Sequence, residues 1–308
     1  MTGDRTATDL SLERIAAAAD KIDPAFLHTP QFVSDRLSSA LAREVVIKNE
    51  TLTPIGSFKG RGTWLLADRL DPARTWVCST AGNFGQGLAY AARARGAAVE
   101  AFVSADVPAA KITGMRALGA QVHVSDKPAA DAREHASATD ERLLVVDGLY
   151  PEMAEGAGTI ALELEPSGPF DLAVVQVGDG ALISGVACAL KAKHPQTRVV
   201  GVCASGAPAL ARSFTARRVV TTQGTNTIAT ALAISEPIPE SLVRVVALVD
   251  EIVLVDDDNL RAAQRLIAET LNVAVEPSGA AGVAALTRHG AALRPGRTAV
   301  LLTGAGAA

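Results

Sequence analysis

The sequence predicts an α/β protein with two open, mostly parallel twisted sheets flanked by helices, in which a small domain is inserted into a larger one. Short β-branched runs alternate with alanine-rich stretches along almost all of the 308 residues. This alternation is typical of parallel sheets with helices on both faces. The expected strands are also continuously apolar, as strands covered on both faces are. Alanine and glycine are abundant and aromatic residues make up only 4%, which favours close packing of helices on sheets.

The individual elements follow from this pattern in chain order. A β-branched or otherwise apolar run flanked by polar or turn residues is taken as a strand, and a longer alanine- or leucine-rich stretch as a helix. The final third of the chain continues the same alternation of strands and helices. The expected strands are residues 45–48, 76–79, 99–103, 122–124, 143–146, 172–177, 199–203 and 299–302; the expected helices are residues 58–69, 85–95, 109–118, 129–138, 153–164, 182–193 and 279–289.

The segment 75–147 carries its own series of strands and helices. We therefore expect it to form a small, mobile α/β domain with its own sheet. Residues 1–74 and 148–308 would then form the large domain, and a cleft would separate the two.

Composition excludes several classes of function. The net charge is −4 and no basic stripe is present, so nucleic acid is not an expected partner. No apolar stretch reaches the ~18 residues of a membrane span, and Met1–Leu10 is polar, without the apolar segment of a signal peptide. A cytoplasmic location is therefore expected by default. The three cysteines, Cys78, Cys188 and Cys203, have no metal-site spacing and are expected to be reduced core residues.

Lys59 is the first candidate for chemistry. It lies between glycines in the stretch Pro54–Gly62, where a helix is expected to start. A partly buried lysine amine loses its proton more readily than one in water, and an unprotonated amine can form an imine with an aldehyde. The alternative is a solvated lysine after a tight turn.

Two loops with small residues follow expected strands and open helices, at 79–87 and at 177–185. Free N–H groups at a helix start suit an anion: a carboxylate at the first loop and a phosphate at the second. Asp179 in the second loop would bring a negative charge close to such a phosphate. The alternative for both is an ordinary strand–helix turn. Thr303, at the carboxyl end of the last expected strand, lies where α/β proteins bind ligands, although it could equally be a simple strand end.

Taken together and in order, these motifs resemble the fold-type II pyridoxal-phosphate enzymes of the tryptophan synthase β superfamily, which include threonine and serine dehydratases. The resemblance spans nearly the whole chain. It runs from Lys48-Asn49-Glu50 and the motif S-F-K-G-R-G at 57–62 to the terminal T-G-A-G at 303–306. The stretches 155–161 and 276–280 resemble the dehydratase branch in particular.

The resemblance implies a role for each matched residue. Lys59 would carry pyridoxal 5'-phosphate as a Schiff base in the cleft and then act as the catalytic base that removes the substrate α-proton. Asn83 would bind the ring hydroxyl of the cofactor, and Thr303 would face the ring nitrogen. The expected cofactor-binding residues are Phe58, Lys59, Asn83, Gly178, Asp179, Gly180, Ala181, Leu182, Glu276 and Thr303; those expected to bind substrate are Ser79, Thr80, Ala81, Gly82, Asn83, Phe84 and Gln86.

The implied activity is α,β-elimination on a small β-hydroxy amino acid such as threonine or serine, which gives ammonia and a 2-oxo acid. Two alternatives stay open: β-replacement in a biosynthetic pathway, and a ligand-binding relative without catalysis. Racemisation is disfavoured because Ala81 stands where serine racemases carry a serine as proton donor. Asp179, Thr230 and Phe84 depart from the family pattern, which normally has glycine, aspartate and histidine there.

The resemblance also bears on partners and regulation. A homodimer is expected by analogy, and no metal ion is expected because no acidic metal-site pattern occurs near Gly206–Leu210. We expect no regulatory domain after the last strand, and therefore no feedback inhibition by isoleucine. All five histidines lie outside the motifs and are taken as surface or structural residues.

Overall fold

The larger of two sheets forms the centre of the molecule. In the computed structural model, which describes residues 8–306, this sheet has six strands in the order β1-β2-β10-β7-β8-β9. All neighbours are parallel except β1, which pairs antiparallel with β2. The strands are β1 (Gln31–Val33), β2 (Val45–Asn49), β7 (Leu172–Gln176), β8 (Arg198–Ala204), β9 (Glu251–Val255) and β10 (Thr298–Leu302).

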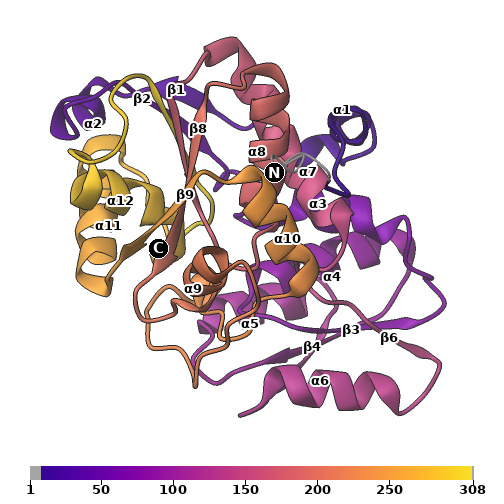
Figure 1. Cartoon of the computed structure of the whole chain (residues 1–308). Coiled ribbons are helices and arrows are strands. Elements are labelled where there is room, and N and C mark those ends of the chain that lie inside the picture. The colour runs from indigo at the N-terminus through magenta and orange to yellow at the C-terminus, as the bar shows by residue number, and fades with distance from the viewer. Residues whose placement is uncertain (1–7, 307–308) are drawn as a thin grey trace.

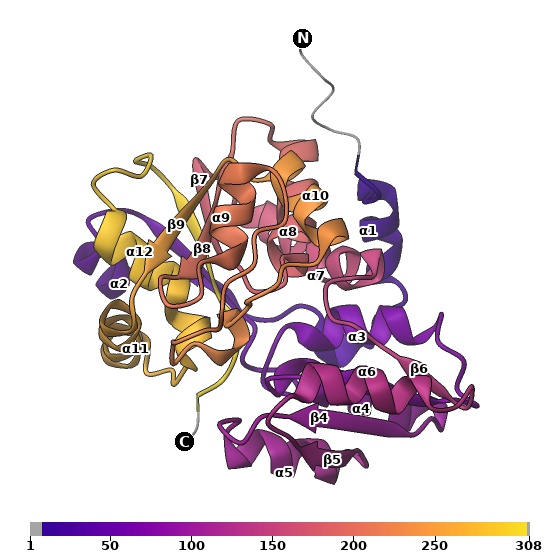
Figure 2. The same cartoon turned by 60° about the horizontal axis from the view of Figure 1, so that its bottom comes forward.

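The second sheet is smaller, with four strands in the order β5-β4-β3-β6, all parallel. Its strands all fall within residues 75–147, and Figures 1 and 2 show it beside the larger body. The predicted fold class of two mostly parallel sheets is therefore confirmed. The boundaries of a separate domain remain a prediction. The elements are β3 (Thr75–Ser79), α4 (Asn83–Arg95), β4 (Val99–Val103), α5 (Ala109–Ala117), β5 (Gln121–Val124), α6 (Pro128–Ser137) and β6 (Arg142–Leu144).

Helices cover both faces of each sheet because side chains alternate between the faces along every strand. In β7, Val175 packs with α7 and α8, whereas Val174 packs with α11 and α12. In β3, Val77 faces α6 and Cys78 faces α4. The remaining helices are α1 (Leu12–Ala19), α2 (Asp35–Ala40), α3 (Lys59–Ala67), α7 (Pro151–Leu164), α8 (Ala181–Lys193), α9 (Ala209–Ala216), α10 (Pro239–Leu248), α11 (Asp257–Leu271) and α12 (Ala281–His289), with short 3-10 turns at η1 (Pro24–Phe26), η2 (Glu165–Ser167), η3 (Thr230–Leu232) and η4 (Pro277–Ala280).

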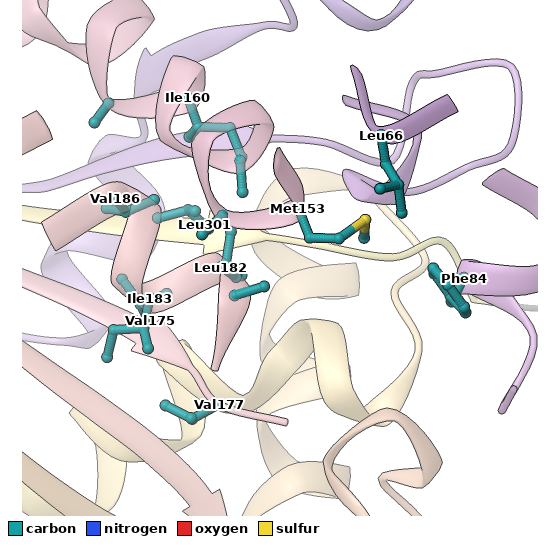
Figure 3. Packing of buried hydrophobic residues seen from close by; sticks show 14 of the residues in the cluster. Leu66, Phe84, Met153, Ile160, Val175, Val177, Leu182, Ile183, Val186 and Leu301 are labelled. Carbon is teal, nitrogen blue, oxygen red and sulfur yellow. The ribbon is translucent and has the colours of Figure 1, made fainter. Parts of the chain in front are cut away.

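One continuous apolar cluster joins the two sheets. It contains residues from α7 and α8 on the large sheet, from α3, and from α4 on the small sheet. Figure 3 shows Met153 of α7 between Leu182 on one side and Leu66 and Phe84 on the other. The packing therefore fixes α3 between the two sheets.

The expected strands and helices are present with small shifts of their ends. The predicted strand 143–146 ends at Leu144, and the predicted helix 279–289 begins as η4 before α12. The elements that were not predicted individually are β1, α1, α2, α9, α10, β9 and α11; the last four lie in the final third of the chain, where only continued strand–helix alternation was expected. Cys78 and Cys203 are buried as expected, and burial raises the pKa of each thiol to about 12. The prediction that all three cysteines are core residues is wrong for Cys188, which is only half-buried.

Two expectations concern membrane spans and a signal peptide. Within the described residues, none of the helices combines the length and the apolar character that crossing a membrane requires. Most of the N-terminal segment, for which no signal peptide is expected, lies outside the described part of the chain.

Glycine allows α7 and α8 to approach closely. A Cβ atom at Gly185 would overlap the carbonyl oxygen of Ala154, and one at Gly158 would lie 3.0 Å from the carbonyl oxygen of Gly185. Because these neighbours are backbone atoms, a side chain could be accommodated only if the helices moved apart.

We predict that Gly185→Ala lowers the free energy of unfolding by about 2–3 kcal/mol, since overpacking of a close helix contact has this cost. Chemical denaturation measures the change. Ala192→Ser on the exposed side of α8 is the control, expected within about 0.5 kcal/mol of the parent. Equal stability of Gly185→Ala and the parent would show that the two helices are not in this contact.

Candidate active site

Lys59 is the first residue of α3 and points into the space between the sheets. Its side chain is 13% exposed, and its Nζ donates to Asp147 Oδ2 in an ion pair. The amine also lies 5.2 Å from the ring centre of Phe58 and 6.0 Å from that of Phe84. Two aromatic rings and one carboxylate therefore surround the amine, and the alternative of a solvated lysine is wrong.

The turn before α3 is tied to the end of β10. Ser57 bridges to Gly304, and the Phe58 N–H donates to the carbonyl oxygen of Thr303 at 3.3 Å. The carboxyl end of the last strand thus sits directly beside the start of the lysine helix.

Arg61, two residues beyond Lys59, is fully buried and anchors α3. Its guanidinium contacts both oxygens of Glu50 at 2.8 and 2.9 Å and reaches Glu163 Oε1 at 2.6 Å; Lys48 Nζ contacts the other oxygen of Glu163 at 2.5 Å. Burial alone would raise the pKa of Glu163, but Arg61 and Lys48 hold it below its usual range. Two cations and two anions thus connect β2, α3 and α7.

The loop after β3 leads directly into α4. The Thr80 hydroxyl accepts the N–H groups of Gly82 at 2.9 Å and of Gly85 at 3.0 Å, so the turn is partly capped by its own threonine. Gly82 precedes the helix with φ +121°, a conformation that favours glycine, and it supplies no side-chain cap. The first N–H groups of α4 lack intrahelical partners and can bind an anion.

The loop after β7 has a similar design. Gly180, with φ +96°, precedes α8 and supplies no side-chain cap, so the first N–H groups of α8 are also suited to an anion. A side chain at Gly178 would collide with the carbonyl oxygen of Ala231. The Ser241 hydroxyl donates to the carbonyl oxygen of Asp179 and fixes the loop from α10.

A cavity of about 500 Å³ lies between these loops, within the ~300–1,000 Å³ that ligand sites usually occupy. Lys59 and Asp179 are in its wall. Gln86 is not: its side-chain oxygen lies against Gly114 of α5. The other predicted residues in the wall are Ser79, Thr80, Ala81, Gly82, Asn83 and Phe84; the predicted residues outside it are Phe58, Gly178, Gly180, Ala181, Leu182, Glu276 and Thr303.

Asn83 and Glu276 are in direct contact. Asn83 Nδ2 donates to Glu276 Oε1 at 2.9 Å, and Lys111 Nζ of α5 pairs with the other oxygen. Glu276 thereby links an asparagine and a lysine of the small-sheet region to the large-sheet region. This contact holds the Asn83 amide in one orientation beside Gly304.

Asp147 and Asp179 make the site more acidic than the sequence alone indicated. The side chain of Asp179 packs against Gly148, next to Asp147. Burial and then the charge of Asp147 raise the pKa of Asp179 to about 7, against the opposing effect of Lys59. Both effects favour the protonated form of this carboxyl group.

Sequence reasoning missed several residues of the site. Asp147 follows β6, so the rule that ligands bind at the carboxyl ends of parallel strands could have found it. Arg133 of α6 and residues 230, 231 and 233–239 also form part of the wall, including Thr230, which departs from the family pattern. Nothing local in the sequence marks them.

Comparison with known proteins agrees with this architecture. The family described as "Pyridoxal-phosphate dependent enzyme" matches residues 22–304. The L-threonine ammonia-lyase of Thermotoga maritima is 33% identical over 90% of this chain and 71% of its own length, and the serine racemase of Arabidopsis thaliana is 34% identical over 88% of this chain and 84% of its own. A solved threonine deaminase structure, from T.th., covers 97% of this chain and 99% of its own, with TM-score 0.89 and 31% identity.

The chain therefore belongs to the pyridoxal-phosphate-dependent enzymes of fold type II. Its cofactor is pyridoxal 5'-phosphate. The geometry fits this group: an amine lies in the cavity wall, and the start of α8 behind Gly180 leaves its N–H groups without a side-chain cap. Asp179 is an unfavourable neighbour for a phosphate dianion, and its raised pKa reduces that conflict.

We predict that binding of pyridoxal phosphate to the apoprotein weakens as the pH rises through about 7, because Asp179 then becomes negative beside the phosphate loop. In Asp179→Asn this dependence should be reduced. About two pH units above that pKa, the variant should bind about tenfold more tightly, which corresponds to one pKa unit of coupling. The cofactor dissociation constant is measured by protein fluorescence across pH. Parallel pH profiles for the two proteins would show that Asp179 does not face the phosphate.

Proposed function

We propose that this chain catalyses α,β-elimination on a small β-hydroxy amino acid such as serine or threonine and releases ammonia and a 2-oxo acid. The observation that carries the proposal is the position of the Lys59 amine in the wall of the cavity, facing the loop that opens α4. Membership of the pyridoxal-phosphate family and the similarity to threonine ammonia-lyases support the same reaction class.

The proposed work of the chain begins with substrate binding. The first N–H groups of α4, at Asn83 and Phe84, would bind the substrate carboxylate, and Thr80 holds that loop in shape. Phe84 is almost completely buried and makes the neighbouring wall apolar. A small substrate side chain suits this surface.

Lys59 would then remove the proton from the α-carbon. Bound pyridoxal phosphate supplies the electron sink for this chemistry. The Lys59 Nζ already donates to Asp147, so this carboxylate is positioned to orient the amine and to exchange a proton with it. The rings of Phe58 and Phe84 limit the access of water to the amine.

Asp179 would act near the leaving group. Its carboxyl group has a pKa of about 7, so it can carry a proton under physiological conditions. Because it lines the same cavity as Lys59, it could donate a hydrogen bond to a hydroxyl group on the substrate β-carbon.

The other proposals rest on analogy or on sequence. We propose a homodimer by analogy with the family, and a cytoplasmic location. The roles of the cofactor-binding and substrate-binding residues, the division at residues 75 and 147, and independence from metal ions are likewise proposals.

We predict that the purified holoenzyme releases equal amounts of ammonia and 2-oxo acid from at least one member of a panel of L-serine, L-threonine and larger 3-hydroxy amino acids. Coupled assays for both products, run with and without an added thiol, measure this. Lys59→Ala should lose activity. Lys191→Ala should retain it, because Lys191 lies near the C-terminal end of α8, where it pairs with Asp250, and is not in the cavity wall.

The panel also distinguishes the alternatives. A product that appears only with the thiol would indicate β-replacement. Accumulation of the opposite enantiomer without ammonia would indicate racemisation, which the methyl group of Ala81 disfavours because it cannot donate a proton. No reaction with any substrate, although the cofactor is bound, would favour a ligand-binding role.

A further inference from the structure

Gln176 is a buried polar residue that the proposed mechanism does not use. It ends β7, two residues before the phosphate loop, and is 3% exposed. Its Nε2 lies 2.8 Å from Thr303 Oγ1, 3.1 Å from the carbonyl oxygen of Leu301, and 3.3 Å from those of Ser278 and Gly279. The side chain thus joins β7 to the end of β10 and to η4.

The orientation of this amide follows from its neighbours. Three of the four surrounding groups are carbonyl oxygens, which can only accept hydrogen bonds. The amide NH₂ must face them, because the amide oxygen in that place would oppose three acceptors. The fourth neighbour, Thr303 Oγ1, therefore accepts a hydrogen bond from Gln176.

A threonine hydroxyl has only one proton to donate. The two amide protons of Gln176 go to its shortest contacts, Thr303 Oγ1 and the carbonyl oxygen of Leu301. The Thr303 oxygen therefore already accepts a hydrogen bond, and its own proton is left to donate elsewhere. We propose that Gln176 is a positioning residue that directs the Thr303 hydroxyl to donate toward the ring nitrogen of pyridoxal phosphate, so that this nitrogen stays unprotonated. The inference rests on the role proposed for Thr303 and extends the proposed function.

Burial of the Gln176 amide oxygen destabilises the fold, which argues that the residue has a specific role. Its Oε1 is buried and has no hydrogen-bond partner among the described residues. An unpaired buried polar atom is destabilising, whereas methionine has similar length and no such atom. The competing explanation is purely structural: Gln176 would only supply a donor to three carbonyl oxygens, and the state of the ring nitrogen would not depend on it.

The test uses holoenzyme loaded with pyridoxal phosphate that carries nitrogen-15 at the ring nitrogen. The nitrogen chemical shift, followed across pH, reports whether the ring is protonated and does not require turnover. We expect the wild type to hold the ring unprotonated at neutral pH. In Gln176→Met the hydroxyl would turn to the free carbonyl oxygens, and the titration should move upward by about one pH unit, the worth of one hydrogen bond.

Two further variants test whether Gln176 acts through the Thr303 hydroxyl. Gln264→Met removes a comparable amide bond, to the carbonyl oxygen of Val275 at 2.7 Å, and should leave the titration unchanged. In a Thr303→Val background, adding Gln176→Met should produce no additional shift, because the hydroxyl through which it acts is gone.

Several results would overturn the proposal. These are a wild-type ring that is protonated at neutral pH, a folded and loaded Gln176→Met with the wild-type titration, or the same shift with and without the Thr303 hydroxyl. A protonated ring in the wild type overturns the proposal even if Gln176→Met does not fold. Because no substrate is present, failure of the elimination assay with the expected nitrogen behaviour would contradict the proposed reaction alone.

Discussion

The buried ion pairs of Arg61 are the constraint on which the position of Lys59 depends. Arg61 has no exposed surface, and it reaches Glu50 beside β2 and Glu163 on α7. Removal of one partner from such a network leaves an uncompensated buried charge, at a cost of roughly 3–5 kcal/mol. The first turn of α3 is therefore held firmly between two other elements. Since Lys59 and Arg61 share this turn, the network also determines where the amine points.

The same constraint explains why the site lies between the two sheets. The apolar cluster that contains Leu66 and Met153 packs α3 against α7 and α4, and the bridge between Ser57 and Gly304 adds β10. The carboxyl ends of β3, β6 and β7 then lead toward one cavity, and the end of β10 lies beside the start of α3. This is where parallel sheets are expected to bind ligands.

The sequence was sufficient to predict the two sheets, because strand and helix periodicities are local signals. It was also sufficient for the loops around Lys59, Asn83 and Gly180, because glycine-rich strand–helix turns are recognisable in one dimension. β1 was not predicted because only three residues form it and it runs antiparallel. β9 was not predicted individually either. The orientation of Gln86 toward α5 could not be predicted either, since tertiary packing decides which way a loop side chain turns.

Other parts of the site arise only from the meeting of distant segments. Asp147 and Asp179 are 32 residues apart in the sequence. The pKa of Asp179 rises because folding buries its carboxyl group and brings it close to Asp147. Gln176 looks like an ordinary strand residue in the sequence, and its contact with Thr303 spans 127 positions. Such pairs carry no periodic or motif signal, so their chemistry becomes visible only in three dimensions.

The central claim is that the amine of Lys59 holds the cofactor. Reduction of the holoenzyme with borohydride fixes the cofactor to the nitrogen that carries it, and peptide mass mapping then identifies the residue. We expect the added mass on the peptide that contains Lys59. The same mass on Lys111 or Lys48 instead, with Lys59 unmodified, would contradict it.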